Sequence, residues 1–317
     1  METTRRAFLT GVGAAAAAAA LPPPAKTAGP AGPRFFVATL TPLDRNGNFD
    51  QALSRDLLAF LRERGVDGAL VLGTTGEFSS FSLRERKKIL EASLRDKGSL
   101  EVMVHVGTPN LPETLELLDH AASAGADSAL VLPPFYYKNP SVDGLARFFS
   151  RVLEAAKIPV LLYQIPQVSG VEIRHELLAR LSQYDKLYGI KDSSGRAEGL
   201  TAYIREFPKL KIFTGSHRLI QTALQQGGAG AITGNGNVFP RETAAVFQEF
   251  RKAGDVAAAQ ARLNEVLGVL GGYDGIPAMK FALGEMGLRE SYCRPPFAEL
   301  APEKKAELKA KLARMKT

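Results

Sequence analysis

A lysine ends the short apolar stretch 188–191, and the polar turn Asp192-Ser193-Ser194 follows it directly. Lysine is almost never fully buried without a partner, so Lys191 is unusual at the end of an apolar strand. A lysine held at such a place can act as a nucleophile that forms a Schiff base with a carbonyl compound. The alternative is an ordinary strand-end lysine with its amine in solvent, and this stretch alone leaves both interpretations open.

Hydroxyl groups follow another apolar stretch, in the segment Gly73-Thr74-Thr75-Gly76-Glu77. Its glycines let the backbone turn tightly and expose its amides, and Thr74 and Thr75 add two donors, so the segment could bind a carboxylate. It could equally be a polar turn in which one threonine caps the next helix. Tyr163 ends a third apolar stretch. Its phenol could move protons if a cation or hydroxyl assists it, or it could be a core tyrosine with a hydrogen-bonded hydroxyl.

Three further segments place polar or aromatic residues after apolar stretches. The segment 133–140 begins with two prolines and presents Tyr136 and Tyr137, which could be packing or interface anchors. The turn Thr214-Gly215-Ser216-His217-Arg218 combines small residues with basic groups, and the loop 233–237 is rich in glycine and asparagine. Flexible loops of this kind can admit a ligand if the fold brings them together.

Metal chemistry and several common hydrolytic mechanisms do not fit this sequence. The histidines have no metal-binding spacing, either among themselves or with carboxylates; they are His105, His120, His175 and His217. Serine-hydrolase and phosphate-loop motifs are absent from the sequence as well. A lysine, a tyrosine and paired hydroxyls without a metal suit a Schiff base with a ketone. We therefore expect no metal, and no cofactor beyond a covalent Schiff base on Lys191.

The elements that must position these residues alternate regularly from residue 34 onward. Short apolar stretches alternate with amphipathic segments, which predicts a parallel sheet with helices outside it. Eight such repeats predict an α/β fold of the (β/α)8 TIM-barrel type, in which all strand ends share one mouth. An open doubly wound sheet is the alternative, but it would be expected to carry a Gly-x-Gly-x-x-Gly turn, which is missing. The expected strands are 35–39, 68–72, 101–106, 128–132, 159–163, 188–191, 211–214 and 230–233, and the expected helices are 50–64, 82–96, 111–124, 141–156, 173–183, 196–207, 217–226 and 240–252.

The chain is expected to contain one barrel with additions at both ends. The barrel should occupy residues 34–253, and residues 254–317 should form a C-terminal helical extension of the same domain, with helices near 254–270, 276–287 and 301–315. The first 33 residues differ, since Arg5-Arg6-Ala7-Phe8-Leu9 precedes a small apolar run and three prolines. This pattern resembles a twin-arginine signal and predicts an exported, periplasmic protein. The alternative is a disordered leader on a cytoplasmic protein.

The composition of the chain limits the kinds of molecule that we expect it to bind. The formal net charge is +7, but the basic residues are scattered among acidic ones, so we expect an attraction for anionic small molecules and no nucleic-acid binding. The apolar run near the N-terminus is shorter than the ~20 residues that span a membrane, so we expect no membrane segment in the mature form. Cys293 is the single cysteine and is expected to be structural.

Three of these motifs occur together in a known family. Gly73-Thr74-Thr75-Gly76-Glu77, Tyr163-x-x-Pro166 and Lys191-Asp192-Ser193 follow one another at spacings near ninety and thirty residues. In these features residues 34–315 resemble the dihydrodipicolinate synthase/N-acetylneuraminate lyase family of class I aldolases. The resemblance implies a (β/α)8 barrel with C-terminal helices and a homo-oligomer, a tetramer or dimer. It also implies a Schiff base between the lysine and a 2-oxo acid, usually pyruvate.

The resemblance assigns roles to individual residues. Lys191 would attack the 2-oxo carbon, and Tyr163 would move the proton of the aldol hydroxyl. Thr74 would relay protons between Tyr163 and Tyr137, a loop tyrosine that reaches into a neighbouring subunit and for which Tyr136 is the alternative. The substrate-binding residues would be Thr74, Thr75, Gly215, Ser216, His217 and Ile232.

Two positions depart from the familiar members. Dihydrodipicolinate synthases carry an arginine where this chain has Val168, and sialic-acid lyases carry an acidic pair where it has His217 and Arg218. We therefore expect a lyase that cleaves or forms a 4-hydroxy-2-oxo acid, such as a 2-oxo-3-deoxy sugar acid, with pyruvate as one partner. The alternatives are a dehydratase on a deoxy-oxo-sugar acid that uses the same lysine, a dihydrodipicolinate synthase, which Val168 disfavours, and a non-catalytic exported binding protein.

Overall fold

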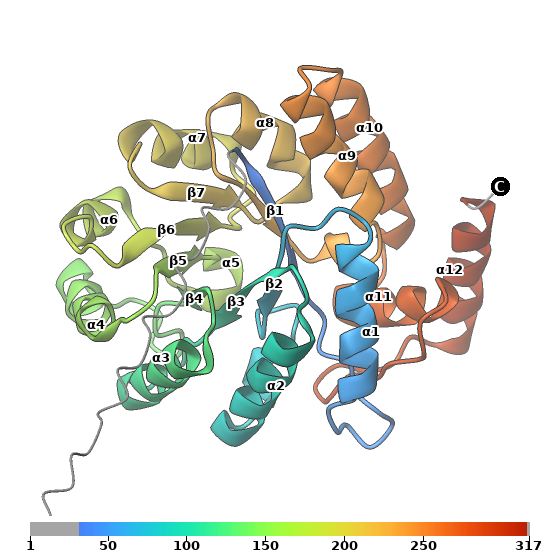
Figure 1. Ribbon diagram of the computed structural model, residues 1–317, viewed down its shortest axis with the longest axis horizontal. Coiled ribbons are helices and arrows are strands. Elements are labelled where there is room, and N and C mark those ends of the chain that lie inside the picture. Colours follow the sequence, from blue (N-terminus) through green and yellow to red (C-terminus); the bar gives the residue numbers. More distant parts are fainter. Residues whose placement is uncertain (1–31, 316–317) are drawn as a thin grey trace, which may run out of the picture. The chain divides into compact units, whose positions relative to one another are not determined.

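Residues 32–315, which the computed structural model describes, form a closed barrel of eight parallel strands. Strand β1 (Arg34–Ala38) pairs in parallel with both β2 (Gly68–Val71) and β8 (Gly230–Thr233), which closes the barrel. Figure 1 shows the helices arranged around these strands. The prediction of a (β/α)8 barrel is thus confirmed. The expected N-terminal signal lies outside the described residues, except for its last two positions.

Most elements begin and end within two residues of their predicted bounds. Strand β5 begins at Val160 and not at Pro159, because proline has no N–H to give to the neighbouring strand. The other strands are β3 (Glu101–His105), β4 (Ser128–Val131), β5 (Val160–Gln164), β6 (Leu187–Asp192) and β7 (Lys211–Thr214). The helices around the barrel are α1 (Gln51–Arg62), α2 (Leu83–Asp96), α3 (Leu111–Ala124), α4 (Val142–Ala155), α6 (His175–Leu181), α7 (Ala197–Glu206), α8 (Ile220–Gln225) and α9 (Pro240–Arg251).

The loops after the strands contain short helical turns, of which only η2 falls within an expected helix. They are η1 (Phe78–Ser80), α5 (Pro166–Ser169), η2 (His217–Leu219) and η3 (Asn235–Asn237). The expected helix 217–226 accordingly begins as a 3₁₀ turn and becomes α-helical only at Ile220. Each turn spans only three or four residues, so no hydrophobic period could reveal it.

Side-chain caps and glycines set the ends of several helices. The Ser82 hydroxyl accepts a hydrogen bond from the backbone N–H of Glu85, and the carboxylate of Glu85 accepts one from the N–H of Ser82, which forms a capping box at the start of α2. Ser141 caps α4, as its position predicted. Gly125 ends α3 with a φ of 89°, a left-handed conformation that costs a glycine little.

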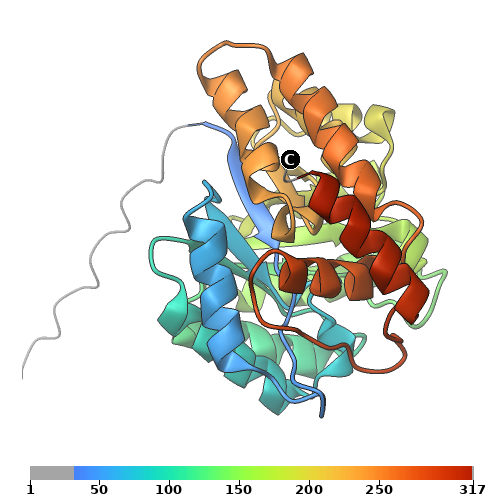
Figure 2. The same ribbon diagram turned by 90° about the vertical axis from the view of Figure 1, so that its right-hand side faces the viewer.

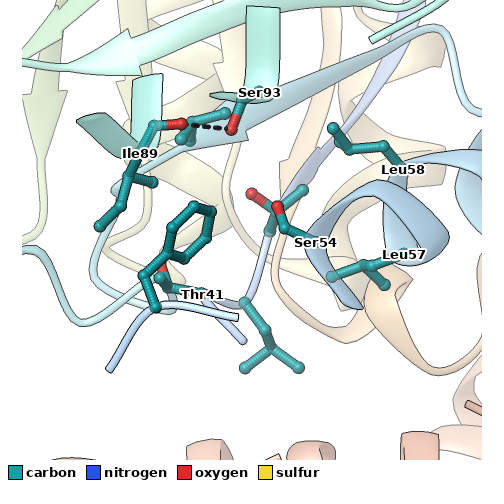
Figure 3. A pocket seen from close by; sticks show the side chains of 10 residues that line it. Thr41, Ser54, Leu57, Leu58, Ile89 and Ser93 are labelled. Carbon is teal, nitrogen blue, oxygen red and sulfur yellow. Dashed lines mark hydrogen bonds between the residues drawn. The ribbon is translucent and has the colours of Figure 1, made fainter. Parts of the chain in front are cut away.

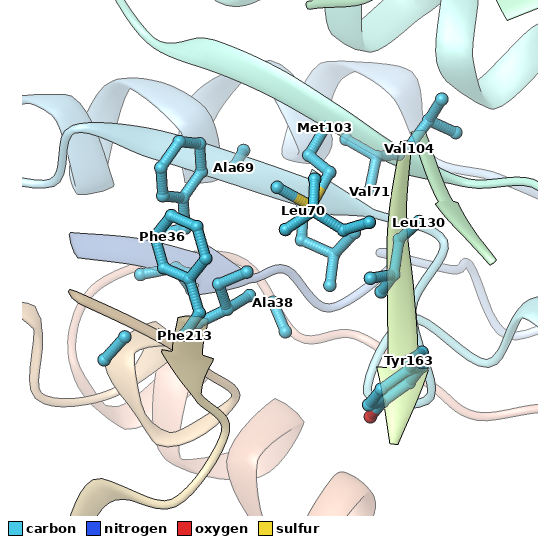
Figure 4. Packing of buried hydrophobic residues seen from close by; sticks show 14 of the residues in the cluster. Phe36, Ala38, Ala69, Leu70, Val71, Met103, Val104, Leu130, Tyr163 and Phe213 are labelled. Carbon is cyan, nitrogen blue, oxygen red and sulfur yellow. The ribbon is translucent and has the colours of Figure 1, made fainter. Parts of the chain in front are cut away.

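Buried side chains of the strands pack together in the hydrophobic core, and Figure 4 shows part of this packing. Phe36 and Phe213 meet edge to face, with 5.9 Å between their ring centroids. Gly68 makes room for this pair, because a Cβ there would lie 2.3 Å from the Phe36 ring. The packed rings support the strands below the mouth, and Tyr163 lies apart from them near the end of its strand (Figure 4).

A small cavity lies outside the strands, beneath helices α1 and α2 (Figure 3). Its lining is partly hydroxylic, with Thr41, Ser54 and Ser93 among aliphatic side chains. Ser93 donates to the carbonyl of Ile89, and Thr41 donates to the carbonyl of Gly76. The hydrogen bond from Thr41 to Gly76 therefore links the loop after β1 to the loop after β2.

The C-terminal extension consists of α10 (Val256–Leu267), η4 (Gly268–Leu270), α11 (Gly275–Glu285) and α12 (Pro302–Arg314). Helix α10 packs against α9, and α12 packs against α11, as the orange-to-red ribbons of Figure 2 show. Among residues 32–315 we find no helix that combines the length and the apolar character needed to cross a bilayer.

Candidate active site

Lys191 lies near the end of β6, inside the barrel, and is 3% exposed. Its register partners are Tyr163 on β5 and Phe213 on β7, so the three side chains point to the same face of the sheet, into the barrel. The Nζ atom lies 4.2 Å from the centroid of the Tyr163 ring, on its face. The solvated strand-end alternative is therefore wrong, because burial against an aromatic face removes this amine from bulk water.

Tyr163 is the central proton-bearing group of this arrangement. Its hydroxyl lies 3.4 Å from Oγ1 of Thr74, a long hydrogen bond in which either oxygen could donate. Burial by itself raises the pKa of the Tyr163 phenol. The positive charge of Lys191 and hydrogen bonds with Thr74, Lys191 and Ser193 outweigh this effect, so the pKa lies below its ordinary value. The lysine, the phenol and the threonine hydroxyl are thus brought together as predicted.

Ser193 belongs to this cluster, although the sequence did not single it out as a site residue. Its side chain is one of the polar groups that lower the pKa of the Tyr163 phenol. Gly215 lies directly beside it, since a Cβ at Gly215 would lie 1.8 Å from Oγ of Ser193. The N–H of Gly215 donates to the carbonyl of Asp192, which ties the turn after β7 to the end of β6. The glycine therefore makes the space that Ser193 fills.

Thr75 faces the loop after β8. A Cβ at Gly234 would lie 2.6 Å from Oγ1 of Thr75, so the loops after β2 and β8 are in close contact at these two residues. Ile232, two residues before Gly234, is fully buried and pairs with Phe36 on β1. The strands β2 and β8 thus place Thr75 and the predicted binding residue Ile232 on one side of the site.

His105 is a second residue of the site that the sequence did not indicate. In the sequence it was considered only as a possible metal ligand. It ends β3, is fully buried, and its ring centroid lies 4.3 Å from that of Phe78 and 6.3 Å from that of Tyr163. Arg86 donates to the backbone carbonyl of His105 at 2.7 Å. Burial, and then the charges of Arg86 and Lys191, lower the pKa of His105 well below its usual value, so the ring is neutral near pH 7.

His217 lies half-buried in the turn after β7, and its imidazole ring is hydrogen-bonded. The amide nitrogen of Asn235 lies 3.0 Å from its Nδ1, and Gln260 donates to its backbone carbonyl. Burial, and then the charge of Arg218, lower the pKa of His217. The N–H of Ser216 donates to Oγ1 of Thr214, which closes the turn. The turn therefore presents a fixed, largely neutral imidazole.

Tyr136 and Tyr137 lie away from the cluster within one chain. They are 74% and 78% exposed, and their rings meet edge to face. Lys138 anchors the same loop by donating to the carbonyls of Phe135 and Ser169. Val168, on α5, is exposed as well. The relay from Thr74 to Tyr137, with either tyrosine reaching from a neighbouring copy, stays a prediction.

Among the described residues 32–315, no group of three or more histidine, cysteine, aspartate or glutamate side chains is placed to hold a metal ion. Cys293 is free, and burial raises the pKa of its thiol to about 12. A thiol with such a pKa is protonated at neutral pH and is a poor nucleophile. The nucleophile that the described site offers is accordingly the amine of Lys191.

The sequence and the fold of this chain are similar to those of known proteins. A sequence model of the dihydrodipicolinate synthetase family matches residues 32–315. An uncharacterized DapA-like lyase of Chloroflexus aurantiacus is 41% identical over 292 residues, which are 90% of this chain and 98% of the relative. A probable 2-dehydro-3-deoxy-D-pentonate aldolase of Escherichia coli, YjhH, is 30% identical over 273 residues, or 82% and 90% of the two chains. The crystal structure of E. coli YagE in complex with pyruvate superposes with a TM-score of 0.84 at 28% identity, over 89% of this chain and 98% of YagE.

Proposed function

The chain belongs to the dihydrodipicolinate synthetase family of Schiff-base lyases and aldolases that act with pyruvate, and we propose that it cleaves or forms a 4-hydroxy-2-oxo acid. One observation supports this proposal most directly. A buried lysine amine lies 4.2 Å from the ring centroid of Tyr163, at the end of the strands, with the hydroxyl of Thr74 beside the phenol. This is a nucleophile with an adjacent proton carrier, which Schiff-base chemistry requires.

The cluster supports a complete sequence of steps for cleavage. Lys191 first gives up a proton, its neutral Nζ attacks C2 of the 2-oxo acid, and the released proton leaves with the water to give the protonated imine. Tyr163 takes the proton from the C4 hydroxyl, the C3–C4 bond breaks, and its electron pair moves into the imine to form an enamine. An aldehyde leaves, C3 of the enamine is protonated, and water hydrolyses the resulting imine to pyruvate and free Lys191. The proton that Tyr163 took passes through Thr74 to C3 of the enamine, which regenerates the phenolate, and Thr75 contributes to holding the carboxylate.

The side chains around the mouth support one substrate class within this proposal. Val168 offers an apolar, exposed side chain where an arginine would bind a second carboxylate. His217 and Asn235 offer hydrogen-bonding groups that suit the hydroxyls of a sugar acid. The similarity to a relative named as a probable 2-dehydro-3-deoxy-D-pentonate aldolase supports the same class. We therefore place 2-oxo-3-deoxy sugar acids first among the candidates.

A panel of such acids tests the proposal directly. We expect at least one 4-hydroxy-2-oxo sugar acid to release stoichiometric pyruvate and an aldehyde, measured by a coupled pyruvate assay and by product mass. Recovery of an intact carbon chain that has lost one water would identify the dehydratase instead. If neither product forms with any acid of the panel but pyruvate still binds, the non-catalytic binding protein is the better interpretation.

Gly215→Ala tests whether Ser193 and its neighbours must keep their places. The added methyl group would overlap Oγ of Ser193, which lies 1.8 Å from the Cβ position, so Ser193 must leave its present place. Because a displacement of about 1 Å near the reacting groups can cost on the order of 100-fold in rate, we expect kcat/KM for the best substrate to fall by ~10–100-fold. Steady-state kinetics measure the change.

Gly199→Ala is the matched control for this substitution. Gly199 lies in helix α7, and the nearest atom to its Cβ position is 3.9 Å away. Alanine is favoured over glycine inside a helix by about 1 kcal/mol, so this variant should be slightly more stable and fully active. Full activity in Gly215→Ala would show that the position of Ser193 does not matter for the reaction.

A further inference from the structure

A buried ion pair lies behind the segment that carries Thr74 and Thr75. Glu77 ends this segment, and Lys280 lies on helix α11 of the C-terminal extension. Nζ of Lys280 is 2.5 Å from Oε1 of Glu77, and the two side chains are 1% and 0% exposed. Nζ of Lys280 also donates to the carbonyl of Tyr292, and the N–H of Arg294 donates to Oε2 of Glu77 at 3.0 Å. Both charges are thus paired and hydrogen-bonded away from water.

The backbone of the same segment is held in an unfavourable conformation. Leu72 and Glu77 have φ angles of 59° and 55°, the left-handed region that residues with a Cβ rarely adopt. These two residues bracket residues 73–76. Such conformations persist only where the surrounding structure enforces them, and they concentrate at functional sites. Something must therefore hold this turn in place.

Two sets of contacts supply this restraint. Inside the turn, Gly76 and Glu77 donate to the carbonyls of Gly73 and Thr74. Behind it, the only cation within ion-pair distance of the Glu77 carboxylate, among the described residues, is Lys280. A buried pair gains little net stability, because removing both ions from water is costly, so its main physical effect is to fix geometry.

The neighbouring Arg294 extends the restraint along the loop. Its guanidinium donates to Glu85 at the start of α2, to the carbonyl of Ser80 and to the carbonyl of Gly47. The hydrogen bond from Arg294 is the largest contribution that lowers the pKa of Glu85 to about 2. Arg294 therefore fastens the C-terminal side of the loop that contains Thr74 and Thr75 and ties it to the loop after β1.

We propose that the Glu77–Lys280 ion pair is a positioning device of the active site, by which the C-terminal extension holds the hydroxyl of Thr74 against the phenol of Tyr163. The proposal rests on the proposed function, because it gives Thr74 a part in the reaction. The contact between Thr74 and Tyr163 is already long, at 3.4 Å, so a small shift of the turn breaks it. Lys191 lies on a different strand and keeps its place, so only the proton-transfer steps depend on the pair.

Lys280→Met tests this inference, with the matched control Lys309→Met, which removes an exposed pair between Lys309 and Glu285. In Lys280→Met we expect borohydride to trap pyruvate on Lys191 as in the unmodified chain. Turnover of the best substrate should fall ~30–100-fold through kcat, with KM changed less than about threefold. Hydrogen exchange of the amides of residues 73–78 should become faster. Lys309→Met should change none of these quantities.

The double variant E77Q/K280M covers the case in which Lys280→Met leaves Glu77 as an unpaired buried charge and does not fold. It removes both charges, and we expect it to fold and to show the same loss of kcat. A kcat within twofold of the unmodified chain in either folded variant overturns the proposal, as does a loss of turnover that only parallels a loss of pyruvate trapping. If the unmodified chain traps no pyruvate, the proposed function fails. Even then, hydrogen exchange of residues 73–78 that stays unchanged in Lys280→Met would separately overturn the inference about the ion pair.

Discussion

Lys191→Met is expected to abolish the covalent adduct with pyruvate and to lower turnover by about 10⁴-fold or more. Removal of a nucleophile that forms the covalent intermediate leaves only binding and orientation, and losses of this size follow. The adduct is measured by borohydride reduction in the presence of pyruvate, followed by intact mass. Turnover is measured as pyruvate release from the best 4-hydroxy-2-oxo acid of the panel.

The fold is expected to survive this substitution. Lys191 is 3% exposed and its amine lies over the Tyr163 ring, a place that an unbranched thioether fills without a buried charge. The matched control is Lys186→Met, since Lys186 is an exposed lysine just before the same strand. It should keep the adduct and full turnover. An adduct that persists in Lys191→Met would identify a different lysine as the nucleophile.

The sequence predicted the barrel because its signals are local and repeated. Each strand is a short apolar stretch, and each helix has its own period, so eight repeats reinforce one another. Lys191, Tyr163 and Thr74 could then be brought together by topology alone, since the ends of parallel barrel strands share one mouth. The barrel and its central cluster therefore followed from order and spacing.

The sequence did not reveal the contacts that depend on long-range packing. His105 lies against Tyr163 only because β3 and β5 face the same interior, and a lone histidine in an apolar strand gives no sign of this. The pair of Glu77 and Lys280 joins residues 203 positions apart, and no local pattern links them. Lys280 itself could have indicated a buried ion pair, because a lysine inside an apolar helix needs a partner.

Tyr163→Phe is expected to lower kcat by ~10²–10³-fold while Lys191 still forms an adduct with pyruvate. The ring and its contact with the lysine amine remain, but the hydroxyl that contacts Thr74 is lost. Loss of a general acid or base costs on the order of 10²–10⁴-fold. Retention of the full kcat would show that another group carries the proton of the aldol hydroxyl.

The pH dependence of this reaction separates the role of the phenol from that of packing. The charge of Lys191 and hydrogen bonds with Thr74, Lys191 and Ser193 bring the pKa of Tyr163 below its ordinary value of 10.0, against the effect of burial. Cleavage needs the phenolate as a base, so kcat/KM should rise with pH through this lowered pKa. Thr74→Val removes one group that stabilises the phenolate, so the rise should move to higher pH, whereas Tyr163→Phe should lose it. If kcat/KM rises at the same pH in Thr74→Val and still rises in Tyr163→Phe, the titrating group is not Tyr163. In that case Tyr163 would contribute only packing around Lys191.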